Sequence, residues 1–408
     1  MKPKSYQRLF DYLSKKRANL IRGLIILAIA AFFGYRCWQS GGVVYPTFII
    51  VFAASALLSL FDRLPARWQN MALNLGISLF FLDFVFAEIN FAEVGQAFVT
   101  ANYWMLAPST ILVLAHLYFR TLRSQWLLKP MGDVPFWPAF RALVIGITGN
   151  AVLPARAGEF LRAYVLGRST GLSKTGVFAN LVVERILDGL SVLLVLVVVI
   201  ILGVRHEALQ KAGILGAVFY MGALVALIIF MTNRHWADML INKLLPENLA
   251  QFALRILDSF TSGLAILKSP NLLAMVLFWN IFTWIPIPLS FWFALRAFDF
   301  GAPIPWQAPV LMLPAMALAL TIPGAPAGVG LVQFAVKLTL DSTFAALPVV
   351  TNFAETVAAA SILIHLSQFG PEVILGVISF MIEGLSTKDI SAGRRMAGSE
   401  ATVESTQA

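Results

Sequence analysis

Long, mostly apolar runs recur along this chain, and they limit its possible folds more than any other feature. Each run approaches the 18 or more residues that a helix needs to cross a hydrocarbon core about 30 Å thick. The runs are Leu20–Trp38, Val43–Phe61, Met71–Glu88, Tyr103–Phe119, Leu190–Gly203 with its polar lead-in, Ala212–Met231 and Leu272–Leu295. Of the 408 residues, 59% are hydrophobic and 12% are charged, which is too little polar surface for a water-soluble core. We therefore predict an all-α, polytopic integral membrane protein, a helical bundle of about eight spans.

The distribution of Lys and Arg predicts the orientation of the spans, because cytoplasmic loops carry an excess of basic residues. The N-terminal segment is basic, Arg63 and Arg67 follow the second run, and 90–102 after the third run has no Lys or Arg. No small-residue cleavage site follows the first run, which is therefore interpreted as an uncleaved span. The pattern predicts a multi-pass protein of the inner or plasma membrane with both termini in the cytoplasm.

The net charge of +9 fits the same interpretation. Basic residues at the cytoplasmic face attract anionic lipid headgroups. Binding to nucleic acid would require a basic, aromatic-interleaved soluble surface, and the sequence has none. Membrane lipids are therefore expected partners and nucleic acid is not.

Two apolar segments, Ala142–Leu153 and Ala308–Ile322, are too short to cross the bilayer and end in helix breakers. The breakers are Pro154 and Gly158 after the first segment, and Pro323, Gly328 and Gly330 after the second. Irregular backbone at membrane depth is tolerated only where protein or a water-filled cavity covers it. Both segments are therefore predicted to be re-entrant hairpins that line a cavity.

A weak internal repeat relates the two hairpins. Gly158 and Gly330 lie 172 positions apart, as do Pro154 and Pro326. Basic loops flank the first hairpin, whereas 299–306 and 341–350 beside the second contain no Lys or Arg, so the two are expected to enter from opposite sides. Such an inverted repeat is typical of transporters whose substrate site lies near the midplane of the bilayer.

Arg156, Glu159 and Arg162 recur every three residues after the first helix break. Residues three apart are neighbours on a helix, so the arginines are expected to flank the carboxylate on one stripe. Guanidinium groups bind phosphate oxygens bidentately, and the start of a helix offers free N–H groups to the same anion. The pattern favours a lipid-phosphate site in which Glu159 orients the arginines. The alternative is a positive-inside anchor with an internal ion pair.

A second charged group, Glu184, Arg185 and Asp188, lies at the start of the next apolar run. Charges inside a membrane helix are unfavourable unless paired or hydrated, so these side chains are expected to face the bundle interior and line a polar path. The alternative is a buried ion pair that only locks two helices together.

In the second half of the chain, Gln333, Glu355 and His365 are assigned to the same polar path. Proton coupling through Glu355 and His365 is an alternative to a purely structural, hydrogen-bonded histidine. Between the halves, 232–270 is polar and carries apolar residues at helical spacing, which predicts an interfacial cytoplasmic helix.

Motifs of soluble enzymes are absent from the sequence. There is no HExxH, GxSxG, CxxC or Walker motif, and the single cysteine, Cys37, excludes an intramolecular disulfide. We therefore expect a protein that is not an enzyme, with no catalytic residue, no metal site and no cofactor.

The strings GNAVLPARAGEFLRAYVLGRSTGLSK, VVERILDG, IPGAPAGVG and IHLSQFGPEVILG resemble the lysylphosphatidylglycerol-synthase transmembrane-region family of flippase-like proteins. The resemblance covers about Met71–Ser386 and implies an integral membrane domain that moves or presents lipids. Some members fuse this domain to a soluble aminoacyl-lipid synthase or a glycosyltransferase. The family pattern falls on Asn150, Pro154, Arg156, Gly158, Glu159, Arg162, Glu184, Arg185, Asp188, Pro323, Gly328 and Gly330. It thereby adds Asn150 to the lipid-phosphate site.

Two departures from the family follow from the sequence. No soluble synthase domain is expected, and Gln333 stands where many relatives carry an acidic residue. The resemblance divides the chain into a basic N-terminal segment with two leading spans (1–70), a flippase-like domain (71–386) and a disordered cytoplasmic tail (387–408).

The resulting prediction is translocation of a phosphate-bearing lipid of the phospholipid or polyprenyl-phosphate type. One alternative is a lipid-presenting intramembrane partner of a glycosyl- or aminoacyl-transferase, which would make a membrane-associated transferase a further partner. Another is a structural scaffold of a membrane complex. The sequence favours no particular oligomeric state.

Overall fold

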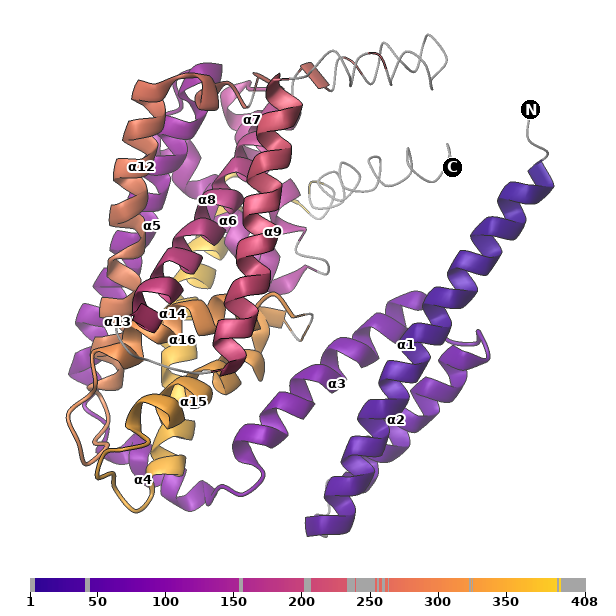
Figure 1. Ribbon diagram of the computed structural model, residues 1–408, viewed down its shortest axis with the longest axis vertical. Coiled ribbons are helices and arrows are strands. Elements are labelled where there is room, and N and C mark those ends of the chain that lie inside the picture. Colours follow the sequence, from indigo (N-terminus) through magenta and orange to yellow (C-terminus); the bar gives the residue numbers. More distant parts are fainter. Residues whose placement is uncertain are drawn as a thin grey trace. The chain divides into compact units, whose positions relative to one another are not determined.

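The computed structural model of the protein describes residues 4–40, 45–153, 157–201, 207–232, 264–322, 324 and 326–386, together with positions 239, 254, 257, 258, 261, 262 and 389. Over these residues the chain is helical and contains no β-strand (Figure 1). Five of the described helical segments are long and apolar enough to cross a membrane: Lys16–Gln39, Ala66–Phe86, Tyr103–Met131, Pro270–Leu295 and Phe353–Ile382. The predicted all-α, multi-pass membrane protein is thereby confirmed.

The chain folds into two compact units. Unit 1 contains the described residues up to Ile89 and those between Ala319 and Phe334, and unit 2 contains the described residues from Asn90 to Leu318 and from Ala335 onward.

Unit 1 is built on α1 (Lys4–Ser40), α2 (Tyr45–Leu60) and α3 (Ala66–Phe86). Apolar side chains from α1 and α2 form its core: Ile26, Ile29, Ala30, Phe33, Phe52 and Ala56. A Cβ atom on Gly76 of α3 would lie 2.9 Å from Cδ1 of Ile29, so the glycine allows α3 to approach α1 closely. Helices with apolar outer surfaces therefore still pack through specific close contacts, as expected within a bilayer.

One polar contact joins the three helices of unit 1. The Asp83 carboxylate on α3 accepts a hydrogen bond from Nε of Arg36 on α1 at 2.9 Å and from the Tyr45 hydroxyl on α2 at 2.6 Å. The carboxylate and the guanidinium balance each other's charge. This Asp83 junction therefore buries a carboxylate without leaving a net charge between the helices.

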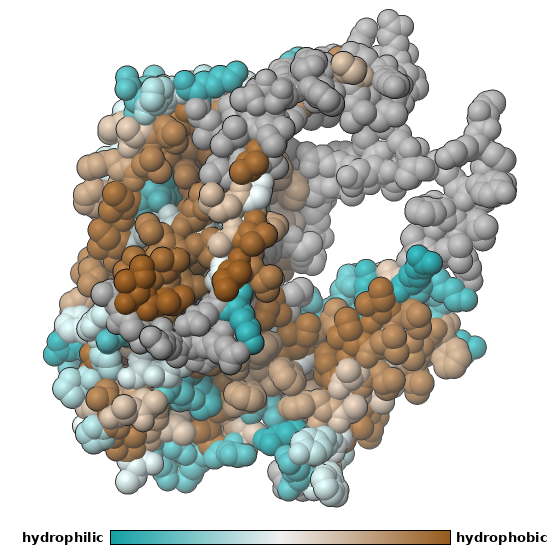
Figure 2. All heavy atoms as spheres, in the orientation of Figure 1, coloured by the Kyte–Doolittle hydropathy of each residue, from teal (hydrophilic) through white to brown (hydrophobic). Residues whose placement is uncertain are grey.

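Unit 2 contains most of the helices. They are α4 (Phe91–Thr100), α5 (Leu106–Leu128), α6 (Phe136–Val152), α7 (Gly158–Thr170), α8 (Lys174–Ile201), α9 (Glu207–Thr232), α12 (Pro270–Trp284), α13 (Pro286–Leu295) and α16 (Phe353–Ile382), whereas α14 (Gln307–Ala319) and α15 (Leu331–Phe344) have residues in both units. Helix α5 packs against α6, α12 and α13, and α7 packs between α6 and α8. Figure 2 shows mostly hydrophobic residues along the sides of this unit and hydrophilic residues toward its ends. That distribution suits a bundle surrounded by lipid.

Three connections that lack Lys and are predicted to face outward meet at one end of unit 2. The Asn102 N–H donates to the Ala297 carbonyl at 2.8 Å, and the Val350 N–H donates to the Phe300 carbonyl at 3.2 Å. At the opposite end of α16, Arg141 pairs with Glu383 at 2.7 Å. The connections that lack Lys therefore lie at one end of unit 2 and the basic residue Arg141 lies at the other, as the distribution of Lys and Arg predicts.

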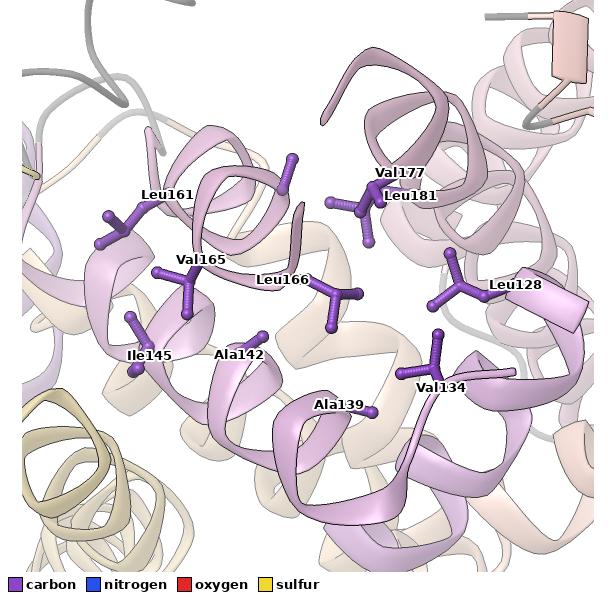
Figure 3. Close-up of a cluster of buried hydrophobic side chains, with 11 residues drawn as sticks. Leu128, Val134, Ala139, Ala142, Ile145, Leu161, Val165, Leu166, Val177 and Leu181 are labelled. Atoms are coloured by element: carbon purple, nitrogen blue, oxygen red, sulfur yellow. The ribbon is translucent and has the colours of Figure 1, made fainter. Parts of the chain in front are cut away.

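The first predicted hairpin segment forms two helices, α6 and α7, that meet at a helix break. A Cβ atom on Gly158 would lie 2.1 Å from the Gly146 carbonyl oxygen and 2.4 Å from the Asn150 nitrogen, so only glycine permits this approach. Apolar side chains of α6, α7 and α8 then interlock, with Ile145, Val165 and Val177 among them (Figure 3). At 1.5 Å per residue, α6 and α7 are about 25 Å and 20 Å long.

The second predicted hairpin segment also consists of two short helices, α14 and α15. Between them Gly328 and Gly330 adopt left-handed backbone conformations, with φ of 74° and 88°, which L-residues with a side chain rarely adopt. The expected breakers Pro154 and Pro323 lie outside the described residues. So do most of the predicted interfacial helix and the predicted tail.

Candidate functional site

A cluster of buried charges lies inside unit 2, where α5, α7 and α8 meet. At its centre Nη1 and Nη2 of Arg162 donate to the two carboxylate oxygens of Glu184 at 2.9 and 3.0 Å. Nη2 of Arg162 also donates to the Ser124 hydroxyl at 3.0 Å. Both members of this ion pair are about 2% exposed or less. The planar fork of Arg162 is thus occupied by one carboxylate in a bidentate contact.

Two arginines of α5 complete the cluster. Nη1 of Arg123 lies 2.7 Å from Asp188, and its Nη2 lies 3.3 Å from Glu184. Arg120 contacts Glu184 through Nε and Asp188 through Nη2, both at 3.2 Å. Arg123 also donates to Asn280 on α12 at 2.5 Å. The two carboxylates of α8 therefore hold three arginines from two other helices, and we call these five residues the arginine cluster.

Local helix geometry explains why these side chains converge. Arg120 and Arg123 are three residues apart, and Glu184 and Asp188 are four apart, so each pair lies on one face of its helix. Gly146 allows α7 to approach α6, because a Cβ there would lie 2.8 Å from Cβ of Arg162. This close approach brings Arg162 into the bundle interior.

Charge in the arginine cluster is not balanced. Three guanidinium groups face two carboxylates, so one positive charge remains even though Arg123 is fully buried and Arg162 is 2% exposed. Within the described part of the chain, Nε of Arg123 and Nε of Arg162 have no hydrogen-bond acceptor. A buried charge without a partner is strongly unfavourable. The cluster therefore favours an additional negative charge.

The accessible edge of the cluster is formed by Arg185. Its side chain is 44% exposed and contacts Glu159 at 2.6 Å and Asp188 at 3.5 Å. The amide of Asn150 on α6 donates to the same Glu159 oxygen at 2.9 Å. This edge also exposes part of Arg120, at 12%. An anion arriving at the cluster would therefore meet Arg185 and Arg120 first.

These contacts differ from the expected pairing of the sequence motif. Glu159 contacts Arg185 and Asn150, whereas Arg162 contacts Glu184. The difference arises because Glu159 and Arg162 are nearly one turn apart on a helix that packs against two others, and each finds a closer partner on a neighbouring helix. Arg156 lies outside the described residues, so its place beside this edge stays a prediction.

The residues assigned to the polar path in the second half lie at other places. The Glu355 carboxylate accepts a hydrogen bond from the Asn90 N–H at 3.4 Å, and His365 is buried with its ring 4.8 Å from the ring of Phe369. In unit 1, Gln333 accepts a hydrogen bond from the Gly330 N–H at 2.8 Å. None of these contacts involves the arginine cluster, and the assignment of the three residues to a path stays a prediction.

The sequence-based site omits three residues that the fold places in or beside the cluster: Arg120, Arg123 and Asn280. The two arginines follow the apolar run that ends at Phe119, so the sequence alone is consistent with a cytoplasmic loop that obeys the positive-inside rule. The apolar residues Trp126, Leu127 and Leu128 after them extend the helix by another two turns. That extension is the signal that places both arginines inside the bundle.

Within the described residues, no group of three or more His, Cys, Asp or Glu side chains could hold a metal ion. The chemistry of the cluster is that of guanidinium groups, which bind oxyanions such as phosphate.

Comparison with known proteins identifies the family. Residues 71–376 match the family described as lysylphosphatidylglycerol synthase TM region, so the chain belongs to this family. A stretch of 104 residues is 31% identical to the protein named glycosyltransferase AglD of Haloferax volcanii, covering 25% of this chain and 16% of the length of that protein. No solved structure matches the chain.

Proposed function

We propose that this member of the lysylphosphatidylglycerol synthase TM region family translocates a phosphate-bearing lipid, of the phospholipid or polyprenyl-phosphate type, across the inner or plasma membrane. The observation that carries the proposal is the unbalanced positive charge of the arginine cluster. A phosphodiester headgroup carries one negative charge and would balance it. The protein would act as a transporter and not as an enzyme.

The headgroup would enter at the exposed edge of the cluster. Arg185 and Arg120 are its more accessible arginines, and both contact the same Asp188 oxygen, at 3.5 and 3.2 Å. A phosphate that replaces these contacts would keep both guanidinium groups in charge-assisted hydrogen bonds. Arg156, three residues before Glu159, is proposed to join them. Arg162 and Arg123 would act mainly by holding the carboxylates in place.

Two opposed re-entrant hairpins in a bundle of about eight spans remain the proposed architecture. Support comes from the lengths of α6, α7, α14 and α15, which have 17, 13, 13 and 14 residues and are each shorter than a hydrocarbon core of about 30 Å. With both termini in the cytoplasm, the connections containing Gln96 and Ala346 would face outward and Lys129 inward. Single cysteines at these positions in a Cys37-free variant, labelled from each side, would test this. Labelling of Gln96 and Ala346 from opposite sides would contradict the topology.

The function is tested by lipid binding and by transport in liposomes that contain only this protein. Arg185→Lys and Arg156→Lys keep the charge but lose the planar fork, and Glu159→Gln removes the partner of Arg185. We expect each variant to bind and move lipid at least tenfold less well, an effect of about 1.4 kcal/mol or more. Phosphatidylglycerol and a polyprenyl phosphate serve as separate probes.

The matched control is Arg168→Lys on α7, the helix that also carries Glu159. Arg168 is 48% exposed and contacts Asp389 outside the cluster, so its replacement should leave lipid binding unchanged. Abundance and thermal stability of every variant are measured in the same detergent. Wild-type transport in all three site variants would rule out the phosphate site.

A second candidate function is presentation of lipid to a transferase without moving it. The stretch that is similar to a protein named as a glycosyltransferase favours this candidate. A presenter would bind lipid through the same cluster, would not move it in liposomes, and would raise the activity of a transferase added to the same membrane. Lipid transport by the purified protein alone decides against it.

A further inference from the structure

Asn280 of α12 contributes an uncharged ligand to the arginine cluster. Its side-chain oxygen accepts a hydrogen bond from Nη1 of Arg123 at 2.5 Å. The same Nη1 atom lies 2.7 Å from Oδ1 of Asp188. An amide oxygen and a carboxylate oxygen therefore share one guanidinium nitrogen, and of these two ligands only the carboxylate offsets the positive charge of Arg123.

The orientation of the Asn280 amide follows from its neighbours. A guanidinium group has only donors, so the amide oxygen must face Arg123. The amide nitrogen donates to the Ser191 hydroxyl on α8 at 2.7 Å, and this hydroxyl donates to the Leu187 carbonyl at 2.8 Å. Each hydrogen bond in this chain has one donor and one acceptor, so the amide is held with its oxygen toward the arginine cluster.

Among the described residues, four side chains offer oxygen atoms to the three arginines of the cluster. Glu184 and Asp188 are carboxylates, whereas Asn280 and Ser124 are uncharged. Asparagine has the same shape as aspartate, so position 280 could hold a carboxylate without any change of packing. Three carboxylates would then match three arginines. The amide at position 280 therefore preserves the surplus positive charge of the cluster.

The net charge of the cluster determines which headgroup it stabilises. An anionic headgroup, such as that of phosphatidylglycerol, neutralises the surplus positive charge, and the interaction is strong because the surroundings are poorly hydrated. A zwitterionic headgroup, such as that of phosphatidylcholine, brings an ammonium group with its phosphate and adds no net charge. A neutral ligand at position 280 therefore favours anionic headgroups.

We propose that Asn280 is a specificity-determining residue, which binds Arg123 without a charge and thereby keeps the arginine cluster selective for anionic over zwitterionic lipid headgroups. The proposal rests on the lipid transport proposed above and names the charge class of the transported lipid. Arg123 is fully buried, so Asn280 acts through it as a positioning residue and not as a ligand of the phosphate. An aspartate at this position would take the place of the headgroup charge.

Asn280→Asp in the full-length protein tests the proposal, because it adds one negative charge and keeps the size of the side chain. We expect at least about tenfold weaker binding and slower transport of anionic lipid, with no loss of phosphatidylcholine binding. The lipid-free variant should unfold at a higher temperature than the wild type, since the buried arginines gain a counter-charge. A side chain with only a structural role would lower the unfolding temperature and weaken binding of both lipid classes.

Binding is measured by native mass spectrometry, with phosphatidylglycerol and a polyprenyl phosphate as anionic probes and phosphatidylcholine as the zwitterionic probe. Asn102→Asp is the matched control, because it adds the same charge at an exposed position outside the cluster. The Asn102 side chain accepts a hydrogen bond from the Trp104 N–H at 3.3 Å, a capping role that aspartate fills equally well. This control should leave binding and unfolding unchanged.

A double variant, Asp188→Asn with Asn280→Asp, provides the second measurement. It moves the carboxylate from one ligand of Arg123 to the other and restores the surplus positive charge. We therefore expect it to bind the anionic probes more tightly than Asn280→Asp alone.

The outcomes are distinguishable. If the wild-type protein binds and moves an anionic probe and Asn280→Asp does so equally well, the specificity proposal is wrong and the transport function stands. A lower unfolding temperature of Asn280→Asp, or a double variant that binds no better than Asn280→Asp, would also overturn the specificity proposal. If the wild-type protein neither binds nor moves either anionic probe, the proposed function fails, and the specificity proposal fails with it.

Discussion

Unit 1 and unit 2 both bury charged side chains between helices, but they balance those charges differently. In unit 1 one carboxylate, Asp83, meets one guanidinium and one hydroxyl, so no net charge remains. In unit 2 three arginines meet Glu184 and Asp188, and one positive charge is left over. A buried junction that is already neutral can serve packing alone, whereas an unbalanced one favours binding of an anion. Counting charges thus separates a structural contact from a candidate binding site.

The largest effect is expected from removing the carboxylate that contacts all three arginines. Glu184→Gln leaves Asp188 as the only carboxylate partner of Arg120 and Arg123, and it leaves Arg162 without its carboxylate. Breaking a buried pair in this way costs about 3 to 5 kcal/mol. Unfolding of the purified variant in a detergent titration would measure the loss. A stability within about 1 kcal/mol of the wild type would mean that the cluster is hydrated and not buried.

A somewhat smaller loss is expected at the helix break that positions Arg162. Gly158→Ala forces a Cβ atom against the Gly146 carbonyl, and relief of that overlap moves α7 away from α6. We expect a destabilisation of about 3 kcal/mol, the upper end for overpacked sites, with loss of lipid binding. Gly95→Ala on α4 is the control, because a Cβ there meets no atom within 4 Å. Equal thermal stability of the two variants would contradict the close approach.

Asp83→Asn tests the balanced side of the comparison. The change removes the ion pair with Arg36 and weakens the hydrogen bond from Tyr45, at about 2 kcal/mol for charge-assisted bonds. Because the charge at this junction is not assigned to lipid, binding per mole of folded protein should stay at the wild-type level. Calorimetry of unfolding and a lipid-binding assay on the same sample measure both quantities. A tenfold or greater loss of lipid affinity would contradict the conclusion that the Asp83 junction serves packing alone.

The smallest effect is expected where a charge is exposed. The Asp389 carboxylate accepts hydrogen bonds from the Ser386 N–H at 2.8 Å and the Tyr164 hydroxyl at 3.0 Å, and it pairs with Arg168. These contacts, the Ser386 N–H first, hold the pKa of Asp389 below its ordinary value of 3.8. Its stabilising contribution is therefore complete above pH 3.8 and is lost as the pH falls through the lowered pKa.

Hydrogen exchange of residues 384–386 measures this contact. Protection should be constant from about pH 8 to pH 5 after correction for the intrinsic exchange rate, and Asp389→Asn should reduce it already at pH 7. A protection that falls steadily between pH 8 and pH 5 would point to a different titrating group. Lipid binding should not depend on this contact, because Asp389 lies outside the arginine cluster.

The length of the apolar runs predicted the class of this fold well because the bilayer demands long helices with an apolar surface. The glycine and proline residues that follow 142–153 and 308–322 also indicated where these short helices end. The pairing of charges was not predictable in the same way. Neighbouring positions on one helix, such as Glu159 and Arg162, suggest a local pair, but the fold pairs them with Arg185 and Glu184 on another helix.

The extent of a helix decides whether a charge is a loop marker or a buried group. Arg120 and Arg123 follow an apolar run and fit the positive-inside rule, yet α5 continues to Leu128 beyond them. Their burial depends on α7 and α8, which are distant in sequence and supply the carboxylates and the packing. The sequence does not show these contacts. It therefore does not distinguish a basic loop residue from a buried arginine, because a basic residue near a helix end suits both environments.

The order of helices along the chain has a consequence for how the protein enters the membrane during synthesis. Helix α8, with Glu184, Arg185 and Asp188, is not one of the five described segments that qualify as spans by their own length and composition. Its arginine partners on α5 and α7 precede it in the chain and leave the ribosome first. We expect α8 to partition into lipid only when these helices are already beside the insertion machinery, because they neutralise its carboxylates on arrival. Membrane insertion of α8 would then depend on its contacts with α5 and α7 and not on its hydropathy alone.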